Sequence, residues 1–187
     1  MQNEAIFLDR DGTINKEYPY ISSVDQIKIP RPSIKGLSLL KSLGFKLFIV
    51  TNQSGVARGY FTLEKLHEIH EHLQKTLTQK GISLDEILFC PHHPDEKCTC
   101  RKPNGALIEK VQEKYQLNIR RSYMIGDNTC DVELGQKMGL KTILVLTGLG
   151  KKTIKVLQQE PDYVATHLFD AAQWIKKNHQ IGSRDKI

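Results

Sequence analysis

Short apolar runs alternate along this chain with longer segments in which apolar residues recur at helical spacing. Six runs predict strands, at residues 5–8, 46–50, 86–89, 122–125, 142–146 and 163–165. Each run is continuously apolar, which is typical of strands that are buried on both faces of a parallel sheet. The pattern therefore favours a sheet that lies between two layers of helices.

The segments between the runs predict those helices. Apolar stripes and end signals place them at residues 33–43, 62–81, 104–115 and 131–138, with two further ones near 153–159 and 168–177. Strands and helices in this alternation predict one doubly wound, mainly parallel α/β domain over residues 1–187. Long loops are expected at residues 15–32 and 90–103, and a polar, solvated C-terminal tail at about 179–187.

Composition narrows the classes of protein that fit. Of the 187 residues, 39% are hydrophobic, which is enough for a core, and no apolar run approaches the roughly 20 residues that span a bilayer. The N-terminus lacks a basic segment followed by a cleavable apolar stretch, so we expect a cytoplasmic protein without a signal peptide. The net charge of +6 fits either a mildly basic surface or a site for anionic ligands.

Polar residues follow the predicted strands, at the positions that meet at one edge of a parallel sheet. Asp9 and Asp11 follow the first strand, and Thr51 follows the second. Lys102 ends the long loop after the third strand, and Asp127 follows the fourth. Converging carboxylates suit Mg²⁺, and cations beside them suit a phosphate. The alternative for the first pair is a solvated Asp-Gly turn.

Three of the four cysteines lie within eleven residues, at Cys90, Cys98 and Cys100. In a chain without a signal peptide, such a cluster indicates metal binding more than disulfides. With one histidine the three thiols make a closed set of four ligands, which predicts a structural Zn²⁺. On spacing alone, either His92 or His93 can complete the set.

Taken in order, these motifs resemble the four motifs of the haloacid dehalogenase-like (HAD) phosphohydrolase superfamily. The residues that carry the likeness are Asp9-x-Asp11-Gly12-Thr13, Thr51, Lys102 and Gly126-Asp127-x₃-Asp131. The resemblance implies that Asp9 attacks phosphorus to form an aspartyl-phosphate, and that Asp11 is first general acid and then general base. It also implies that Thr51 and Lys102 stabilise the phosphoryl oxygens.

The same resemblance implies a set of magnesium ligands. They are the carboxylate of Asp9, the backbone carbonyl of Asp11 and the carboxylate of Asp127. Asp131 has two explanations that the residues leave open. It either supports the metal through an intervening group or stabilises the N-terminus of a helix.

Within that superfamily, the cysteine loop resembles one found in two groups, the heptose-1,7-bisphosphate 7-phosphatases and the histidinol-phosphate phosphatases. Cys-Pro-His at 90–92 and Cys-x-Cys-Arg-Lys-Pro at 98–103 carry this likeness, which implies that His92 is the zinc ligand. Segments 9–15 and 51–59 resemble the heptose group. Ser54 stands where the histidinol-phosphate enzymes tend to have an aspartate.

The likeness to the heptose group implies Mg²⁺-dependent hydrolysis of the C7 phosphate of D-glycero-D-manno-heptose 1,7-bisphosphate, in the synthesis of ADP- or GDP-heptose precursors for surface glycans such as lipopolysaccharide. Arg101 would bind the second phosphate, at C1. Asn128 stands where a bacterial enzyme of that group has a lysine that contacts the substrate. The residues implied to bind substrate are Glu17, Tyr18, Pro19, Tyr20, Thr51, Asn52, Gln53, Ser54, Arg101, Lys102 and Asn128.

Other functions fit parts of the pattern. Histidinol phosphate carries a positively charged amine, so an enzyme for this substrate would have little need of the positive charge of Arg101. A nucleic-acid end phosphatase would suit the positive charge but predicts a basic track with interleaved aromatics, which the sequence lacks. A zinc-stabilised binding module would have no need of both Asp9 and Asp11. We therefore expect a small sugar bisphosphate as partner, no nucleic acid or membrane, and a monomer.

Four further residues were expected to have no part in the chemistry. His67, His70 and His72 are expected on solvated helix faces, and Cys130 is expected to face the core.

Overall fold

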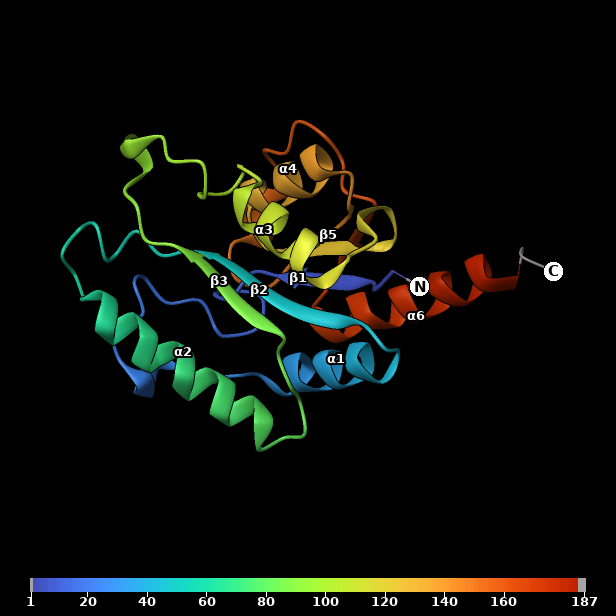
Figure 1. The fold of residues 1–187 in the computed structure, drawn as a ribbon, viewed down its shortest axis with the longest axis horizontal. Helices are drawn as coiled ribbons and strands as arrows, with labels where there is room; N and C mark the ends of the chain where they lie inside the picture. Colours follow the sequence, from blue (N-terminus) through green and yellow to red (C-terminus); the bar gives the residue numbers. More distant parts are fainter. Residues whose placement is uncertain (1, 185–187) are drawn as a thin grey trace.

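The computed structural model describes residues 2–184, which form a parallel sheet between helices (Figure 1). The strands are β1 (Ala5–Leu8), β2 (Lys46–Asn52), β3 (Glu86–Cys90), β4 (Tyr123–Gly126), β5 (Lys141–Val145) and β6 (Tyr163–Ala165). Their order across the sheet is β3-β2-β1-β4-β5-β6, and all neighbours are parallel. The order reverses beside β1, which confirms the doubly wound sheet that the sequence predicts.

Six helices connect or flank the strands of the described chain. They are α1 (Arg31–Ser42), α2 (Leu63–Thr78), α3 (Ala106–Tyr115), α4 (Thr129–Met138), α5 (Gly150–Thr153) and α6 (Leu168–Arg184). Short 3₁₀ turns occupy Val24–Gln26, Pro94–Glu96 and Ile119–Arg121. Local sequence signals determine where several of these helices begin or end. The Thr62 hydroxyl oxygen accepts a bond of 3.2 Å from the Lys65 amide at the start of α2, and Gly139 closes α4 in the left-handed region (φ 75°).

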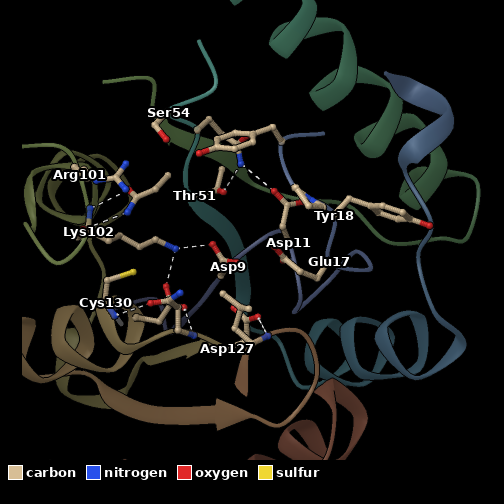
Figure 2. A pocket seen from close by; sticks show the side chains of 17 residues that line it. Asp9, Asp11, Glu17, Tyr18, Thr51, Ser54, Arg101, Lys102, Asp127 and Cys130 are labelled. Atoms are coloured by element: carbon tan, nitrogen blue, oxygen red, sulfur yellow. Dashed lines mark hydrogen bonds and ion pairs between the residues drawn. The ribbon is translucent and has the colours of Figure 1, made fainter. Parts of the chain in front are cut away.

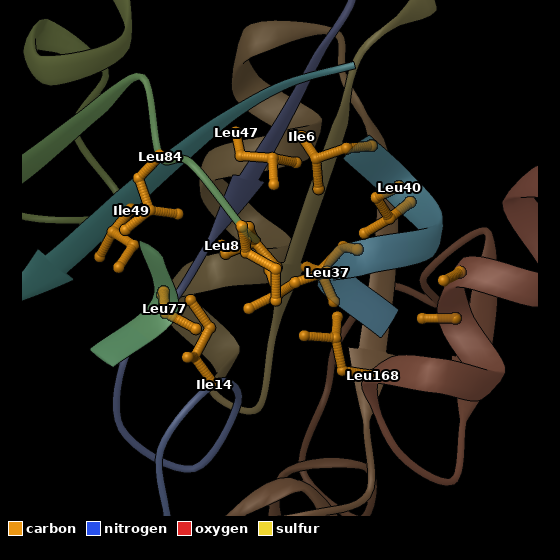
Figure 3. Packing of buried hydrophobic residues seen from close by; sticks show 14 of the residues in the cluster. Ile6, Leu8, Ile14, Leu37, Leu40, Leu47, Ile49, Leu77, Leu84 and Leu168 are labelled. Carbon is orange, nitrogen blue, oxygen red and sulfur yellow. The ribbon is translucent and has the colours of Figure 1, made fainter. Parts of the chain in front are cut away.

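Two hydrophobic cores lie on the two faces of the sheet, and β1 contributes to both. Ile6 and Leu8 pack with residues of α1, α2 and α6, and Figure 3 shows this core with Leu37 and Leu168. Phe7, from the opposite face of the same strand, packs with residues of α3 and α4. All four residues of β1 are fully buried. The central strand is therefore held rigidly from both sides, and so is the loop that follows it.

The helix predicted near residues 153–159 is wrong. α5 is a single turn that begins at Gly150 and ends at Thr153. Thr153 donates a hydrogen bond of 2.8 Å from its hydroxyl to the backbone oxygen of Asp127. Ile154 and Val156 are 40% and 67% exposed, so the apolar residues of this segment do not form a buried stripe.

The C-terminal helix is longer than its periodicity indicates. α6 runs to Arg184, beyond residue 179, where the sequence predicts the polar tail to begin, and residues 185–187 lie outside the described residues. His179 contacts Phe45, at a ring-centre distance of 5.0 Å, and lies 3.3 Å from the Glu4 carboxylate. No helix within residues 2–184 has both the length and the apolar character that crossing a membrane requires.

The topology brings the predicted functional segments together. Leu8 at the end of β1 is the partner of Ile125 in β4, and of Ile49 in β2. The residues that follow these three strands therefore emerge side by side, although up to about 120 residues separate them along the chain.

Candidate active site and metal centres

A cavity of about 490 Å³ opens at the carboxyl ends of β1, β2 and β4 (Figure 2). It brings together every residue that the sequence analysis assigns to the substrate or the magnesium ion. Those residues are Asp9, Asp11, Glu17, Tyr18, Pro19, Tyr20, Thr51, Asn52, Gln53, Ser54, Arg101, Lys102, Asp127 and Asn128. Cys130, Asp131 and Leu149 complete the wall. Their placement is a finding of the structure, whereas their roles remain predictions.

Lys102 is the buried cation at the centre of the cavity. Its ammonium lies 2.6 Å from Asp9 Oδ1 and 2.6 Å from Asp131 Oδ1, and it donates a third bond of 2.6 Å to the Val50 carbonyl. Burial alone would lower the pKa of Lys102, but the charges of Asp131 and Asp9 raise it well above its ordinary value. The side chain therefore stays positively charged and fixes the Asp9 carboxylate in place.

Three carboxylates surround one point at the base of the cavity. Oxygen atoms of Asp9, Asp127 and Asp131 lie within 4.8 Å of one another, and all three residues are buried. Burial raises the pKa of Asp9 to about 7, although Lys102 opposes the shift. Burial, together with the charge of Asp9, raises the pKa of Asp127 to about 8. These crowded oxygens fit a hard divalent cation, which would relieve their repulsion.

The backbone of two loops packs closely around Asp127. Gly12 (φ 80°) and Gly148 (φ 53°) approach it so closely that a Cβ on either would lie 2.0 Å from Asp127 Oδ2. The Leu149 amide donates a bond of 2.7 Å to the same oxygen. The Thr147 hydroxyl joins the loops with a 2.5 Å bond to the Gly12 carbonyl. One carboxylate oxygen of Asp127 is thereby fixed by backbone that only glycine can form.

Asp11 has a different set of partners. Arg10 donates to its two carboxylate oxygens, at 2.9 Å from Nε and 2.6 Å from Nη2. Gln53 donates a further bond of 3.1 Å from Nε2 to Asp11 Oδ2 and one of 2.9 Å to the Thr51 hydroxyl oxygen. The Asp11 side chain is 18% exposed and faces the cavity. The predicted metal bond of Asp11 concerns its backbone carbonyl and stays a prediction.

Asn52 joins the end of β2 to the end of the cysteine loop. Its Oδ1 accepts a bond of 3.0 Å from the Lys102 amide, and its Nδ2 donates one of 3.2 Å to the Lys102 carbonyl. This pair fixes the backbone that presents Arg101 and Lys102 to the cavity. Arg101 Nη1 is buried and has no hydrogen-bond partner among the described residues. An anion in the cavity would satisfy this donor.

The second cluster lies in the loop that follows β3. Donor atoms of Cys90, His92, Cys98 and Cys100 lie within 4.8 Å of one another. His92 Nδ1 is 3.5 Å from Cys90 Sγ and 3.2 Å from Cys100 Sγ, and Cys98 Sγ is 3.4 and 3.5 Å from these two sulfurs. Donors around a tetrahedral zinc ion are separated by roughly 3.5–3.8 Å. The four residues therefore fit a tetrahedral metal ion with little movement.

The neighbouring histidine, His93, makes a different contact. His93 is the N-cap of the 3₁₀ turn Pro94–Glu96, where its Nδ1 accepts a bond of 3.3 Å from the Asp95 amide. The structure thus separates two histidines that spacing alone leaves equivalent. His92, not His93, lies among the thiols.

Known proteins resemble the chain in sequence. Residues 99–171 match the model of a hydrolase-like family that is described as HAD-hydrolase-like. A Helicobacter pylori protein (strain J99) named D-glycero-beta-D-manno-heptose-1,7-bisphosphate 7-phosphatase is 41% identical over 152 residues, which cover 81% of this chain and 87% of that protein. A Photorhabdus laumondii protein, named as the phosphatase of the alpha form, is 36% identical over 159 residues, with coverages of 79% and 87%.

The chain belongs to the heptose-1,7-bisphosphate 7-phosphatase family.

A solved structure supports this membership. The D,D-heptose 1,7-bisphosphate phosphatase from B. bronchiseptica, complexed with magnesium and phosphate, has a TM-score of 0.88 and 30% identity to the present structure. The match covers 94% of this chain and 99% of that one. The phosphatases of this family are phosphoric monoester hydrolases by name, and the HAD-like fold expected from the motifs is confirmed.

The sequence does not predict where several polar residues of this heptose-bisphosphate phosphatase family member lie. His70 was expected on a solvated face, but it is buried and its Nε2 lies 3.0 Å from Arg10 Nη1, while His67 and His72 are exposed as expected. Cys130 faces the cavity instead of the core. The helical stripe of α2 carries a signal for His70, because it lies four residues after Leu66 and three before Leu73, which are both buried.

The structure places Asp131 in the first turn of α4, as one of its two explanations requires, whereas its support of a metal stays a prediction. Its Oδ1 contacts Lys102, and its Oδ2 accepts a bond of 3.0 Å from the Asn128 amide at the start of α4. The Asn128 side chain in turn accepts a bond of 3.4 Å from the Cys130 amide. Asn128 is thus engaged in capping the helix, at the position where a bacterial relative was expected to have lysine.

Proposed function

We propose that this chain hydrolyses the C7 phosphate of D-glycero-D-manno-heptose 1,7-bisphosphate to give heptose 1-phosphate and inorganic phosphate. One observation carries the proposal. A single cavity holds a buried carboxylate fixed by a lysine, a second carboxylate at its wall and a separate arginine with an unpartnered donor. A bisphosphate substrate would interact with all three of these groups. The names of the relatives, at 36–41% identity, support the same substrate.

In the first step of the proposed mechanism, a carboxylate oxygen of Asp9 attacks the phosphorus of the C7 phosphate. The P–O bond to the sugar breaks as the aspartyl-phosphate forms, and Asp11 donates a proton to the departing C7 oxygen. Asp11 then accepts a proton from the water that attacks the aspartyl-phosphate, which releases phosphate and restores Asp9. Lys102 and the Thr51 hydroxyl bind the phosphoryl oxygens throughout.

A magnesium ion fits the base of this cavity. We propose that it binds to the carboxylates of Asp9 and Asp127 and to the backbone carbonyl of Asp11. When bound, it supplies positive charge that lowers the repulsion between the carboxylates and the phosphate. The raised pKa values of Asp9 and Asp127 support the assignment, because burial and the charges of neighbouring carboxylates raise both, and a bound cation would offset these effects. Asp131 contributes by fixing Lys102.

The rest of the cavity would bind the sugar and its second phosphate. Arg101 is suited to the C1 phosphate, because a guanidinium forms paired bonds with phosphate oxygens and its Nη1 has no other partner among the described residues. Segment 17–20 forms one wall and segment 51–54 the opposite one. Asn128 is engaged as a helix cap, so we assign it only a contact of its exposed edge with the substrate.

We propose that the Cys/His cluster binds Zn²⁺ in a structural role. Four donors fill a tetrahedral shell and leave no position for substrate. The ion would fix the loop of residues 90–103, which ends at Arg101 and Lys102.

We further propose that residues 1–187 act as a single domain, as a monomer in the cytoplasm, with a small sugar bisphosphate as the partner.

Phosphate release with Mg²⁺ tests the proposed reaction. The substrates are both anomers of heptose 1,7-bisphosphate, fructose 1,6-bisphosphate, histidinol phosphate and a 3′-phosphorylated oligonucleotide, with Asp9→Asn as the blank. Both anomers are needed because relatives are named for each form. We expect a preference for one heptose anomer, with heptose 1-phosphate identified as the product by ³¹P NMR. Faster turnover of histidinol phosphate, or release of the C1 phosphate, would overturn the proposal.

A further inference from the structure

Arg10 is the largest fully buried side chain of the described residues, although arginine is ordinarily a surface residue. It stands between the two catalytic carboxylates in sequence, but its side chain turns away from the cavity. Its guanidinium forms a fork with Asp11, in which Nε and Nη2 each donate to a different carboxylate oxygen. Such a fork fixes the plane of a carboxylate, which a single-point contact cannot do.

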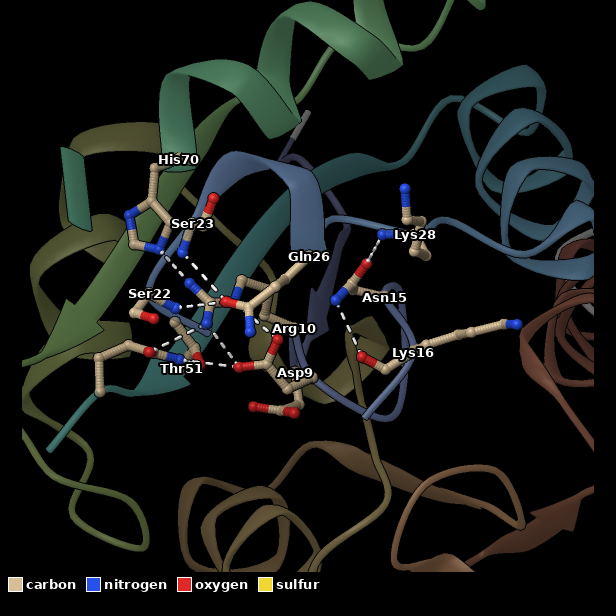
Figure 4. Close-up of polar contacts among 12 residues, drawn as sticks. Asp9, Arg10, Asn15, Lys16, Ser22, Ser23, Gln26, Lys28, Thr51 and His70 are labelled. Carbon is tan, nitrogen blue, oxygen red and sulfur yellow. Dashed lines mark hydrogen bonds and ion pairs between the residues drawn. The ribbon is translucent and has the colours of Figure 1, made fainter. Parts of the chain in front are cut away.

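The other side of the guanidinium is fixed as well. Arg10 Nη2 donates a second bond, of 2.9 Å, to Gln53 Oε1. Arg10 Nη1 lies 3.0 Å from His70 Nε2 of α2, and Figure 4 shows His70 and Arg10 facing each other. A guanidinium has only donors, so His70 Nε2 accepts and the proton of the ring lies on Nδ1. Burial and the nearby charge of Arg10 lower the pKa of His70 to about 3, which keeps this ring neutral.

We propose that Arg10 is a positioning residue that holds the Asp11 carboxylate in the orientation for proton transfer to the leaving oxygen, and that His70 anchors Arg10 from α2. The inference deepens the proposed function and rests on the role that it gives to Asp11. The chain of contacts runs from α2 through His70 and Arg10 to Asp11. Gln53, the residue after β2, supports it by contacting both Arg10 and Asp11. Neither Arg10 nor His70 lines the cavity.

This role predicts a dependence on the leaving group. A sugar alkoxide is a poor leaving group and needs a proton from Asp11 as the P–O bond breaks. The 4-nitrophenolate ion leaves without protonation. A variant that misplaces Asp11 should therefore lose kcat/KM on the sugar phosphate and keep it on 4-nitrophenyl phosphate. General disorder of the cavity would lower both values equally.

The first test compares Arg10→Lys with the wild-type enzyme on both substrates. Lysine keeps the positive charge but cannot form the fork. We expect kcat/KM for heptose 1,7-bisphosphate to fall about 30- to 100-fold and that for 4-nitrophenyl phosphate to fall less than about threefold. Equal losses on the two substrates would overturn the inference. If the wild-type enzyme itself released no phosphate from either ester, the proposed function would fail instead.

A second set of variants is independent of whether Arg10→Lys folds. His70→Leu removes the acceptor, and His70→Gln supplies another oxygen that can accept from Arg10. His67→Leu is the matched control, because His67 lies one turn away on α2, is exposed and contacts the same Phe89 ring. We expect about a fivefold to tenfold loss for His70→Leu on the sugar phosphate alone, recovery in His70→Gln and no loss in His67→Leu. A loss in His70→Leu that glutamine does not restore would contradict the anchoring role.

Discussion

The two clusters of candidate metal ligands in this protein are built in opposite ways. The carboxylate cluster (Asp9, Asp127 and Asp131) comes from the ends of two strands and the first turn of a helix, and all of it is buried. The thiol cluster (Cys90, His92, Cys98 and Cys100) comes from eleven consecutive residues, and three of its four members are partly exposed. The tertiary fold brings the carboxylates of the first cluster together. The donors of the second come from one short loop.

This difference predicts a different role for the metal ion that each cluster would bind. The carboxylates are fixed by Lys102, by the Leu149 amide and by tight glycine contacts, so the fold exists before the ion arrives. The thiols have few partners other than one another. A bound ion would therefore stabilise the loop itself. Loss of metal from the carboxylate cluster should remove activity and leave the fold intact, whereas loss of metal from the thiol cluster should lower both activity and stability.

The largest expected effect is that of Asp9→Asn. The amide cannot act as the nucleophile, so kcat/KM should fall by at least about 10³-fold in the phosphate-release assay. Zinc content, measured by elemental analysis of the purified protein, should remain at the wild-type level, because the thiol cluster is separate. Residual activity near one tenth of the wild-type value would show that Asp9 is not the nucleophile.

The next effect concerns the thiol cluster and uses two neighbouring histidines. His92→Ala should lose the tightly bound metal and about 2–4 kcal/mol of stability, which corresponds to a fall of roughly 5–15 °C in Tm. Activity should fall with it, because the loop presents Arg101 and Lys102. His93→Ala is the control and should retain its metal, since His93 only caps a 3₁₀ turn. Equal metal loss in both variants would refute the assignment of His92.

A smaller effect is expected where backbone contacts the carboxylate cluster. Gly148→Ala places a Cβ 2.0 Å from Asp127 Oδ2, so this carboxylate must move. The Mg²⁺ concentration for half-maximal activity should rise about tenfold, with zinc content unchanged. Gly139→Ala is the matched control. It also has a positive φ, of 75°, but no atom lies within 4 Å of the added carbon, so it carries the backbone strain alone. Equal shifts in both variants would exclude the steric explanation.

The smallest effect isolates a pH dependence that involves neither metal. The pKa of His70 is about 3 in the fold and about 6.5 in the unfolded chain, so only the unfolded chain takes up this proton as the pH falls through 6.5. Stability is complete above that value and is lost towards pH 3. At pH 5 the loss from His70 is about 2 kcal/mol. Denaturant titrations at pH 7.5 and 5 should show a smaller decline for His70→Gln than for wild type, and an equal decline would contradict this.

Sequence reasoning located the site because its residues obey a positional rule. Asp9 and Asp127 each follow a buried strand and Thr51 lies near the end of another, and parallel strands bring such positions to one edge. Spacing also revealed the thiol cluster, but it could not choose between His92 and His93, since the choice depends on the turn that His93 caps. The strand pattern was clearest for β1 and β4, whose residues are all buried.

Other features depend on contacts that no local pattern encodes. Arg10 between two aspartates resembles a solvated turn, and its burial requires His70, 60 residues away. Gly148 contacts Asp127 only because the loop after β5 folds over the end of β4. The short helix α5 was misplaced for a related reason, because Thr153 is held by a bond to the Asp127 backbone and not by an apolar stripe.

The spacing of the two clusters along the chain also sets an order of assembly during synthesis. A ribosome releases the chain from its N-terminus, so all four donors of the thiol cluster are available once residue 100 has emerged. Asp9 emerges among the first residues, yet its partner carboxylates arrive at positions 127 and 131 and the glycine beside them at 148. A nascent chain would therefore be able to bind a metal ion at the thiol cluster before the carboxylate cluster is complete. Asp9, the proposed nucleophile, is made early, and on this proposal it cannot act until most of the protein has been translated.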